Sequence, residues 1–105
     1  MSIPAANAER MVRMRHRLET AFPSAAIEVI DDSHRHIGHA GARDGRGHFI
    51  VDIVSDRFEG LSSLARHRAI YAALGDMMST DIHALSIRAA TLAEHAARAP
   101  TTGSA

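Results

Sequence analysis

The chain is 105 residues long, carries 12 basic and 12 acidic side chains, and is 46% hydrophobic. This length suits a single domain with one modest core. The balanced charge does not favour nucleic-acid binding by bulk attraction, which leaves a local basic patch as the route to it. The chain contains no cysteine, which excludes disulfides, thiolate nucleophiles and any cysteine-ligated metal site made by this chain alone.

The sequence shows no stretch that approaches an apolar membrane span. Residues 1–8 do not resemble a signal peptide, because no basic start precedes an apolar segment. We therefore expect a cytoplasmic protein without a membrane partner. All the basic residues are arginine and alanine is abundant, as is typical of GC-rich coding in a bacterium.

The first predicted element is a helix that Asn7 caps and that runs to about Ala21, after a disordered segment over residues 1–6. Its apolar positions recur every three or four residues and comprise Met11, Met14, Leu18 and Phe22. Its other sides carry Arg10, Arg13, Arg15 and Arg17. We expect these arginines to form a solvated helix face, and the alternative is a phosphate-binding patch.

Two strands and a long loop follow. Residues 26–30 and 48–55 alternate as strands do, and the second is apolar on both faces, which predicts a central strand. The intervening loop, 31–47, holds four glycines and three histidines, His34, His36 and His39. Loops of this length in a small domain are more often functional than accidental. Taken alone, the three histidines favour adventitious binding of nickel or zinc, because a structural zinc site needs four fixed ligands.

The stretch from Phe58 to Leu85 predicts a turn, a helix and a strand. The helix is capped by Ser62 or Ser63 and continues to Met78, with a short helix leading into the main one. Its expected buried stripe consists of Leu64, His67, Tyr71, Leu74 and Met78. A third strand is predicted over residues 84–89, and a last helix, capped by Thr91, over residues 91–98. Residues 100–105 are expected to be a disordered tail.

The remaining histidines differ in their expected roles. His83 precedes the third strand with the same parity as Leu85 and Ile87, so its ring is expected to lean toward the core while still reaching a ligand. The alternative for His83 is a partly exposed ring bonded to the backbone. His67 is interpreted as a buried neutral imidazole. His48, which begins a strand, is interpreted as structural or as a neighbour of a site, and His16 and His95 as surface residues.

Six motifs in this order resemble the BolA family. They are Asp31-Asp32-Ser33, Gly38-His39-Ala40-Gly41, His48-Phe49, Val54-Ser55-Asp56-Arg57-Phe58 with Gly60, Arg66-His67-Arg68 with Tyr71 and Leu74, and His83-Ala84-Leu85. The resemblance spans roughly residues 11–89. It implies an α+β, class II KH-like domain over residues 7–99, with the order α-β-β-α-α-β-α, a three-stranded mixed sheet and helices on one face.

The resemblance also implies a function. BolA-like proteins pair with monothiol glutaredoxins that carry a Cys-Gly-Phe-Ser site, and the pair shares a 2Fe–2S cluster that is also held by glutathione. For this chain it implies His83 as one cluster ligand. The second would come from the 31–47 loop, either His36, three residues beyond Ser33, or His39. Arg66 and Arg68 are expected to reach acidic groups on a partner.

Two further hypotheses remain at this point. Some BolA-like proteins are described as DNA-binding regulators, but the turn Gly60-Leu61-Ser62-Ser63 lacks the second glycine of the Gly-x-x-Gly loop that KH modules use. An adaptor that binds the glutaredoxin without a cluster is the other hypothesis. No catalytic residues are predicted, because the serines lack a nucleophile elbow and the sequence contains no P-loop, so we do not expect an enzyme.

Overall fold

The computed structural model describes residues 5–32 and 47–98. The elements in chain order are α1 (Ala5–Ala21), β1 (Ala26–Asp31), β2 (Gly47–Val54), the 3-10 turn η3 (Asp56–Phe58), α2 (Ser63–Leu74), α3 (Met77–Thr80), β3 (Ile82–Ala90) and α4 (Leu92–Arg98). This order confirms the predicted α+β arrangement. None of the helices in the described ranges is long and apolar enough to cross a membrane.

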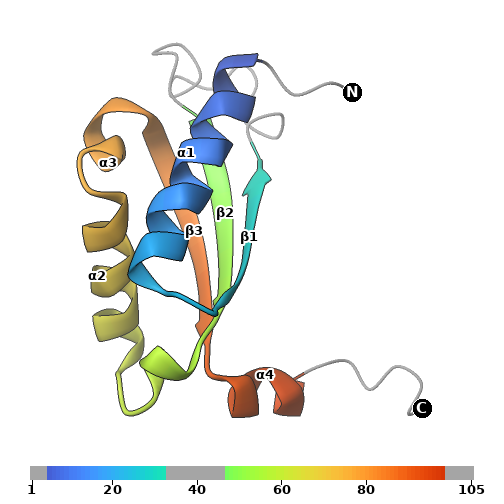
Figure 1. Cartoon of the computed structure of the whole chain (residues 1–105). Coiled ribbons are helices and arrows are strands. Elements are labelled where there is room, and N and C mark those ends of the chain that lie inside the picture. The colour runs from blue at the N-terminus through green and yellow to red at the C-terminus, as the bar shows by residue number, and fades with distance from the viewer. Residues whose placement is uncertain (1–4, 33–46, 99–105) are drawn as a thin grey trace, which may run out of the picture.

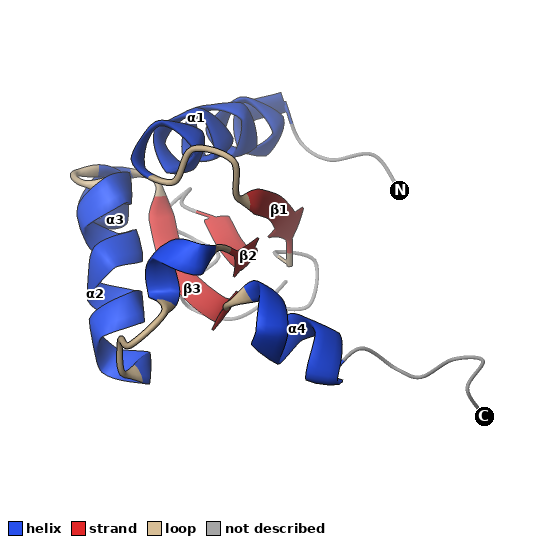
Figure 2. Ribbon diagram, turned by 60° about the horizontal axis from the view of Figure 1, so that its bottom comes forward, coloured by secondary structure: helices blue, strands red, loops and turns tan. Residues whose placement is uncertain are grey.

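The sheet has the strand order β1-β2-β3, with β1 and β2 antiparallel and β2 and β3 parallel. β2 is central, as its two apolar faces predicted. Helices α1, α2 and α3 lie together over one face of this mixed sheet, whereas α4 leaves the far end of β3 (Figure 1, Figure 2). We call the face that carries these three helices the helical face, and the opposite one the outer face.

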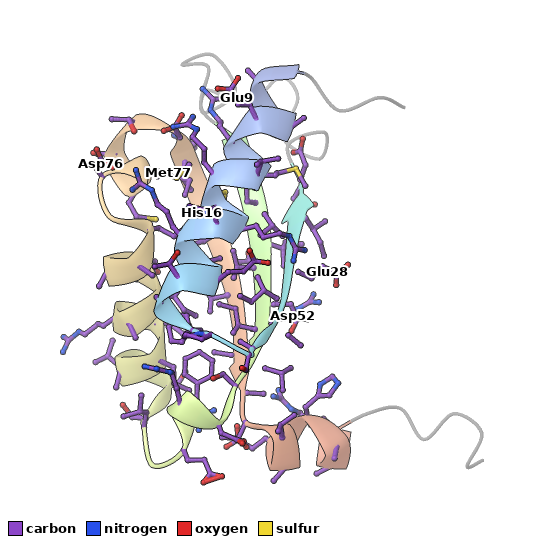
Figure 3. All side chains as sticks on the ribbon, viewed as in Figure 1. Glu9, His16, Glu28, Asp52, Asp76 and Met77 are labelled. Carbon is purple, nitrogen blue, oxygen red and sulfur yellow. The ribbon has the colours of Figure 1, made fainter. Side chains whose placement is uncertain are left out.

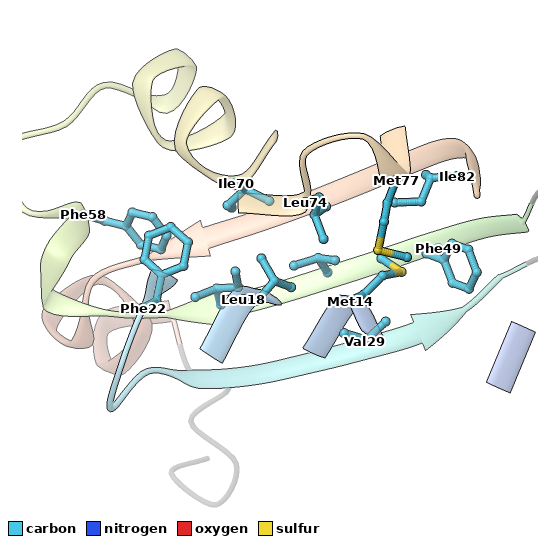
Figure 4. Packing of buried hydrophobic residues seen from close by; sticks show 12 residues of the cluster. Met14, Leu18, Phe22, Val29, Phe49, Phe58, Ile70, Leu74, Met77 and Ile82 are labelled. Atoms are coloured by element: carbon cyan, nitrogen blue, oxygen red, sulfur yellow. The ribbon is translucent and has the colours of Figure 1, made fainter. Parts of the chain in front are cut away.

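The core lies between the helical face and its helices. Its fully buried members are Met14, Leu18, Phe49, Val51, Ile53, Phe58, Ile70, Leu74, Met77 and Ile82. Figure 4 shows the aromatic pair Phe22 and Phe58 at one end of this cluster, and their ring centroids are 5.2 Å apart. The predicted stripe of α1 is largely confirmed, since Met14, Leu18 and Phe22 are buried and Met11 packs against the cluster.

The predicted cap of α1 is wrong. The helix begins at Ala5, so Asn7 lies inside it and is buried. Its side-chain amide donates to Asp31 Oδ2 at 3.2 Å and accepts from the Arg10 guanidinium at 2.8 Å. Asn7 therefore links the helix to the end of β1. Its side chain is used for this tertiary contact and not for capping the helix.

The predicted buried stripe of α2 is only partly confirmed. Leu74 is fully buried and Met78 packs against the core, as predicted. Leu64, however, is 59% exposed and Tyr71 is 40% exposed, and the fully buried Ile70 was not predicted. The helix is thus turned by about one residue, or roughly 100°, from the expected orientation. This orientation buries an all-carbon Ile70 and leaves the tyrosine hydroxyl near water, so no buried hydroxyl needs a partner.

Gly75 ends α2 and separates it from α3. Its backbone has φ 59° and ψ −131°, a region that favours glycine because it has no Cβ. Met77 is consequently buried at the start of a separate helix. The prediction of a short helix that leads into a main helix up to Met78 is therefore wrong in order, because the short helix follows the main one. Ser62 caps α2 as one of the two predicted residues, accepting from the Ala65 N–H.

Candidate functional site

Two histidine rings lie side by side where β2 and β3 begin. Parallel strands start at the same edge of a sheet, and Gly47 pairs with Ile82 at this edge. The ring centroids of His48 and His83 are 5.0 Å apart, with their planes 52° from each other. His48 is buried, whereas His83 is exposed. We call this pair and the strand ends that carry it the histidine edge.

A β-bulge decides which way His83 points. Gly47 pairs with Ile82 and His48 with Ala84, so His83 is an extra residue on β3. Ile82 and Leu85 both pack in the core, although an uninterrupted strand would send them to opposite faces. The expectation that His83 leans toward the core with Leu85 and Ile87 is therefore wrong, because the bulge places its ring beside His48 on the outer face.

His48 has a closer relation to the site than the sequence indicated. Phe49 is buried on the helical face, so strand alternation directs His48 to the outer face. The sequence could have indicated this proximity, because two histidines that each begin one of two paired parallel strands lie next to one another. It did not give the register of the pairing, which the bulge shifts by one residue.

The loop that carries His34, His36 and His39 lies outside the described residues, so the position of these rings is not part of the structure. The two ends of that segment are nevertheless fixed at the histidine edge. The Asp32 N–H donates to the His48 carbonyl at 2.8 Å, and the Gly47 N–H donates to the Asp81 carbonyl at 3.0 Å. The chain therefore leaves and re-enters the described structure beside the histidine pair.

Gly47 is required sterically at this return point. A Cβ at Gly47 would lie 2.5 Å from two ring carbons of Phe49 and 3.0 Å from Asn7 Oδ1. No larger residue fits unless the buried Phe49 ring moves. Within the described ranges, no group of three or more histidine, aspartate or glutamate side chains is placed to hold a metal ion.

A polar network supports the histidine edge from the side of α1. Asp81 accepts from Arg10 Nε at 3.1 Å and from Arg13 Nη2 at 2.9 Å. Partial burial works to raise the pKa of Asp81, but hydrogen bonds from Thr80, Arg10 and Arg13 outweigh it and hold this pKa below its usual value. Arg10 also bonds Asn7, which reaches Asp31, so one network joins the starts of α1 and β3 to the end of β1.

Most of the basic side chains of α1 are engaged within the protein. Arg17 donates to the Leu74 carbonyl at 2.6 Å and to Asp76 at 2.9 Å. Arg15 lies 3.7 Å from Glu19 on the same helix. The predicted solvated face is confirmed for Arg13 and Arg15, whose side chains are 46% and 45% exposed. It is wrong for Arg10, which is only 16% exposed. All four arginines contact an acidic side chain of this chain, which weakens the phosphate-binding alternative. A groove of about 310 Å³ lies on the helical face, lined by Ala8, Met11, Val12, Arg15 and Val29.

Arg66 was also expected to face a partner, and this expectation is wrong. Its guanidinium contacts Glu94 at 2.5 and 3.0 Å and donates to the carbonyls of Leu61 and Ala89. It also lies over the Phe58 ring, 5.8 Å from the centroid. Arg68, by contrast, is exposed as predicted, and His67 is half-buried rather than buried.

Residues 18–94 match the family described as BolA-like protein. The chain belongs to the BolA family. This BolA-family chain is 43% identical over 82 residues to the DNA-binding transcriptional regulator BolA of Escherichia coli (strain K12), a match that covers 78% of this chain and 75% of the relative. It is 46% identical over 90 residues to SufE-like protein 1 of Arabidopsis thaliana, covering 81% of this chain and 24% of that longer protein.

Solved BolA structures share the fold. The BolA domain of SufE1 from Arabidopsis thaliana matches with a TM-score of 0.73 at 42% identity, covering 89% of this chain and 99% of that one. The solution structure of BolA1 from Mus musculus matches with a TM-score of 0.71 at 33% identity, covering 92% and 73%. The family and the fold expected from the six motifs are thereby confirmed.

Proposed function

We propose that this BolA-family protein is a non-enzymatic adaptor that shares a 2Fe–2S cluster with a monothiol glutaredoxin carrying a Cys-Gly-Phe-Ser site. The observation that carries the proposal is the exposed imidazole of His83, set out from the sheet by a bulge. An imidazole on a rigid strand is a fixed ligand for a metal that a partner presents. The chain has no cysteine, so the thiolates come from the glutaredoxin and from glutathione.

The donor set suits this group. His83 is the ligand offered by β3, and either His36 or His39 is the ligand offered by the loop, whose ends are fixed beside His48 and Asp81. The described residues hold no complete metal site, which agrees with a cluster that a partner must help to hold. When bound, a cluster with imidazole in place of thiolate carries less negative charge and has a higher reduction potential than an all-thiolate one.

Reconstitution of the pair tests the proposal. The protein is mixed with a recombinant monothiol glutaredoxin, glutathione, iron and sulfide, and we expect a heterodimer whose visible spectrum differs from that of the glutaredoxin homodimer. His83→Ala should abolish this difference, whereas His95→Ala, on the exposed face of α4, should keep it. An unchanged spectrum and heterodimer in His83→Ala would contradict the ligand assignment. Comparison of His36→Ala with His39→Ala identifies the loop ligand.

The second candidate is a DNA-binding regulator, favoured by the name of the Escherichia coli relative. The arginines held by Asp81, Asp76 and Glu94 are offset by these acids, which leaves the exposed Arg57 and Arg68 as cations before and after the Gly60 turn. Gel-shift experiments at several salt concentrations test this function. Specific binding that persists near physiological ionic strength, with a slope that reports phosphate contacts, would support it, and binding that is lost for all sequences at that salt would exclude it.

A further inference from the structure

The middle of the outer face is an open surface next to the histidine edge. Strand pairing arranges it in rows across the sheet: Ile30, Ile50 and Ser86 form one row, and Glu28, Asp52 and Arg88 form the next. We call these six residues the outer sheet patch. Ile30 and Ile50 are half-exposed, and Arg88 is 65% exposed. The row of Ile30 is adjacent to His48 and Ala84, so the patch is continuous with the histidine edge.

Among residues 5–32 and 47–98, the charges of this patch are incompletely matched. Glu28 and Asp52 are direct partners in the antiparallel pairing of β1 and β2, and Figure 3 shows both beside β1. Two like charges directly opposite each other destabilise a sheet. Arg88 offsets this at a distance of 4.0 Å from Asp52, on the side away from Glu28. The row therefore carries two carboxylates and one exposed guanidinium, which contacts Asp52.

The opposite side of the molecule offers a competing surface. Leu64 and Tyr71 project from α2 and are exposed. However, α2 covers the helical face, whereas the bulge directs His83 to the outer face. A partner that brings a metal-bound thiolate to His83 must approach from the outer side, so a protein seated on α2 would have the sheet between it and this ligand.

We propose that the outer sheet patch is the docking surface for the thiolate-bearing partner, with the Ile30 and Ile50 row as its apolar centre and a partner lysine or arginine over Glu28 and Asp52. This inference rests on the proposed function, because it specifies where the cluster-sharing glutaredoxin seats. It adds a requirement to that function: a basic side chain on the partner, close to its thiolate. It also assigns the α2 surface no part in cluster sharing.

Charge reversal at Glu28 tests the proposal in the absence of a cluster. Glu28→Arg removes the repulsion with Asp52, so the free energy of unfolding should stay the same or rise. The affinity of the apo protein for the same glutaredoxin, measured by calorimetry, should fall by at least about tenfold, because a like charge then faces the partner's basic residue. Glu9→Arg, an identical charge change on α1, should leave the affinity unchanged. Ser86→Arg, which crowds the patch from β3, should weaken binding as well.

The outcomes separate the two proposals. Weakened binding by Glu28→Arg and Ser86→Arg, with normal binding by Leu64→Ser on α2, supports the outer sheet patch. Weakened binding by Leu64→Ser alone overturns it and places the dock on α2, while the proposed function stands on the His83-dependent spectrum. A wild-type protein that binds the apo glutaredoxin and forms no shared cluster contradicts the proposed function, and the same Glu28 comparison then still decides where the partner sits. A wild-type protein that does not bind at all overturns both.

Discussion

Contacts between arginines and carboxylates hold both ends of the sheet, but the two ends differ in how far their side chains are exposed to solvent. At the histidine edge, Arg10 and Arg13 of α1 converge on Asp81, and the rings of His48 and His83 lie against each other on the outer face. At the far end, Arg66 and Glu94 form a two-point contact over Phe58. We call this end the Arg66 closure. Val54 and Ala90 are buried there, whereas His83 is exposed.

The difference shows how a small domain can expose a side chain such as His83, which we propose as a ligand, without losing stability. The Arg66 closure combines polar contacts with the aromatic pair Phe22 and Phe58, both of which are part of the core. The histidine edge uses polar contacts to fix backbone positions, and its exposed ring adds little to packing. We therefore expect substitutions at the far end to change folding most, and substitutions at the histidine edge to change binding most.

The largest effect is expected from Phe58→Ala. The Phe58 ring is fully buried and packs on Phe22, and removing such a ring costs about 3–5 kcal/mol in the free energy of unfolding. Urea denaturation measures this value. Leu64→Ala, an exposed apolar position on α2, should change it by less than about 0.5 kcal/mol. Similar losses in the two variants would show that the far end is not part of the core.

The next effect concerns acid stability at the Arg66 closure. Hydrogen bonds from Arg66 and the Thr91 backbone lower the pKa of Glu94 from 4.5 to about 2. A carboxylate with a depressed pKa in the folded state contributes stability above its unfolded pKa and loses it as the pH falls toward the folded value. Stability should therefore fall between pH 4.5 and about 2. Glu94→Gln should be less stable at pH 7 and should show a flatter profile in this window, as thermal unfolding at several pH values would reveal.

A smaller effect is expected from Asp81→Asn at the histidine edge. The substitution keeps the size of the side chain but removes the charge that Arg10 and Arg13 contact. We expect a loss of about 1.5–3 kcal/mol in the free energy of unfolding, as for hydrogen bonds to charged groups. Glu19→Gln, which alters the exposed pair with Arg15, is the matched control and should cost less than about 1 kcal/mol. Equal costs for the two variants would mean that the network does not support the edge.

The smallest effect on folding is expected from His83→Ala. The ring is exposed and lies on an extra residue of β3, so the free energy of unfolding should change by less than about 0.5 kcal/mol. This is the same substitution that should abolish the cluster-dependent spectrum. A large loss of stability would instead assign His83 a structural role and would remove the contrast between the two ends of the sheet.

The sequence predicted the elements better than their orientation. Alternation along β2 and the spacing of Met14, Leu18 and Phe22 report burial directly, so the central strand and the inner face of α1 were predictable. The orientation of α2 was not, because Ile70 and Tyr71 are neighbours in the sequence and only the packing decides which is buried. The proximity of His48 to His83 depends on a bulge, which alternation alone does not reveal.

Charged partners were the least predictable feature of the site. Arg66 lies outside the expected buried stripe of its helix, and its partner Glu94 lies on another helix. The capping pattern Thr91-x-x-Glu94 was a partial signal, and it is observed: the Glu94 N–H donates to the Thr91 hydroxyl, and the Thr91 N–H donates to the Glu94 carboxylate. This pattern accounts for α4, but the pairing with Arg66 required the fold.

The anchoring of the two ends of the histidine-bearing loop has a consequence for how such proteins can diversify. Asp32 and Gly47 are tied to neighbouring backbone groups, so the span that the loop must close is set by the sheet. Doubling the length of a flexible loop across a fixed span costs only about 0.6 kcal/mol. Insertions and deletions between these two anchors are therefore inexpensive. His83 is held in the register of β3, so of the two positions that we propose as ligands, one is fixed by the sheet and the other can vary at little cost.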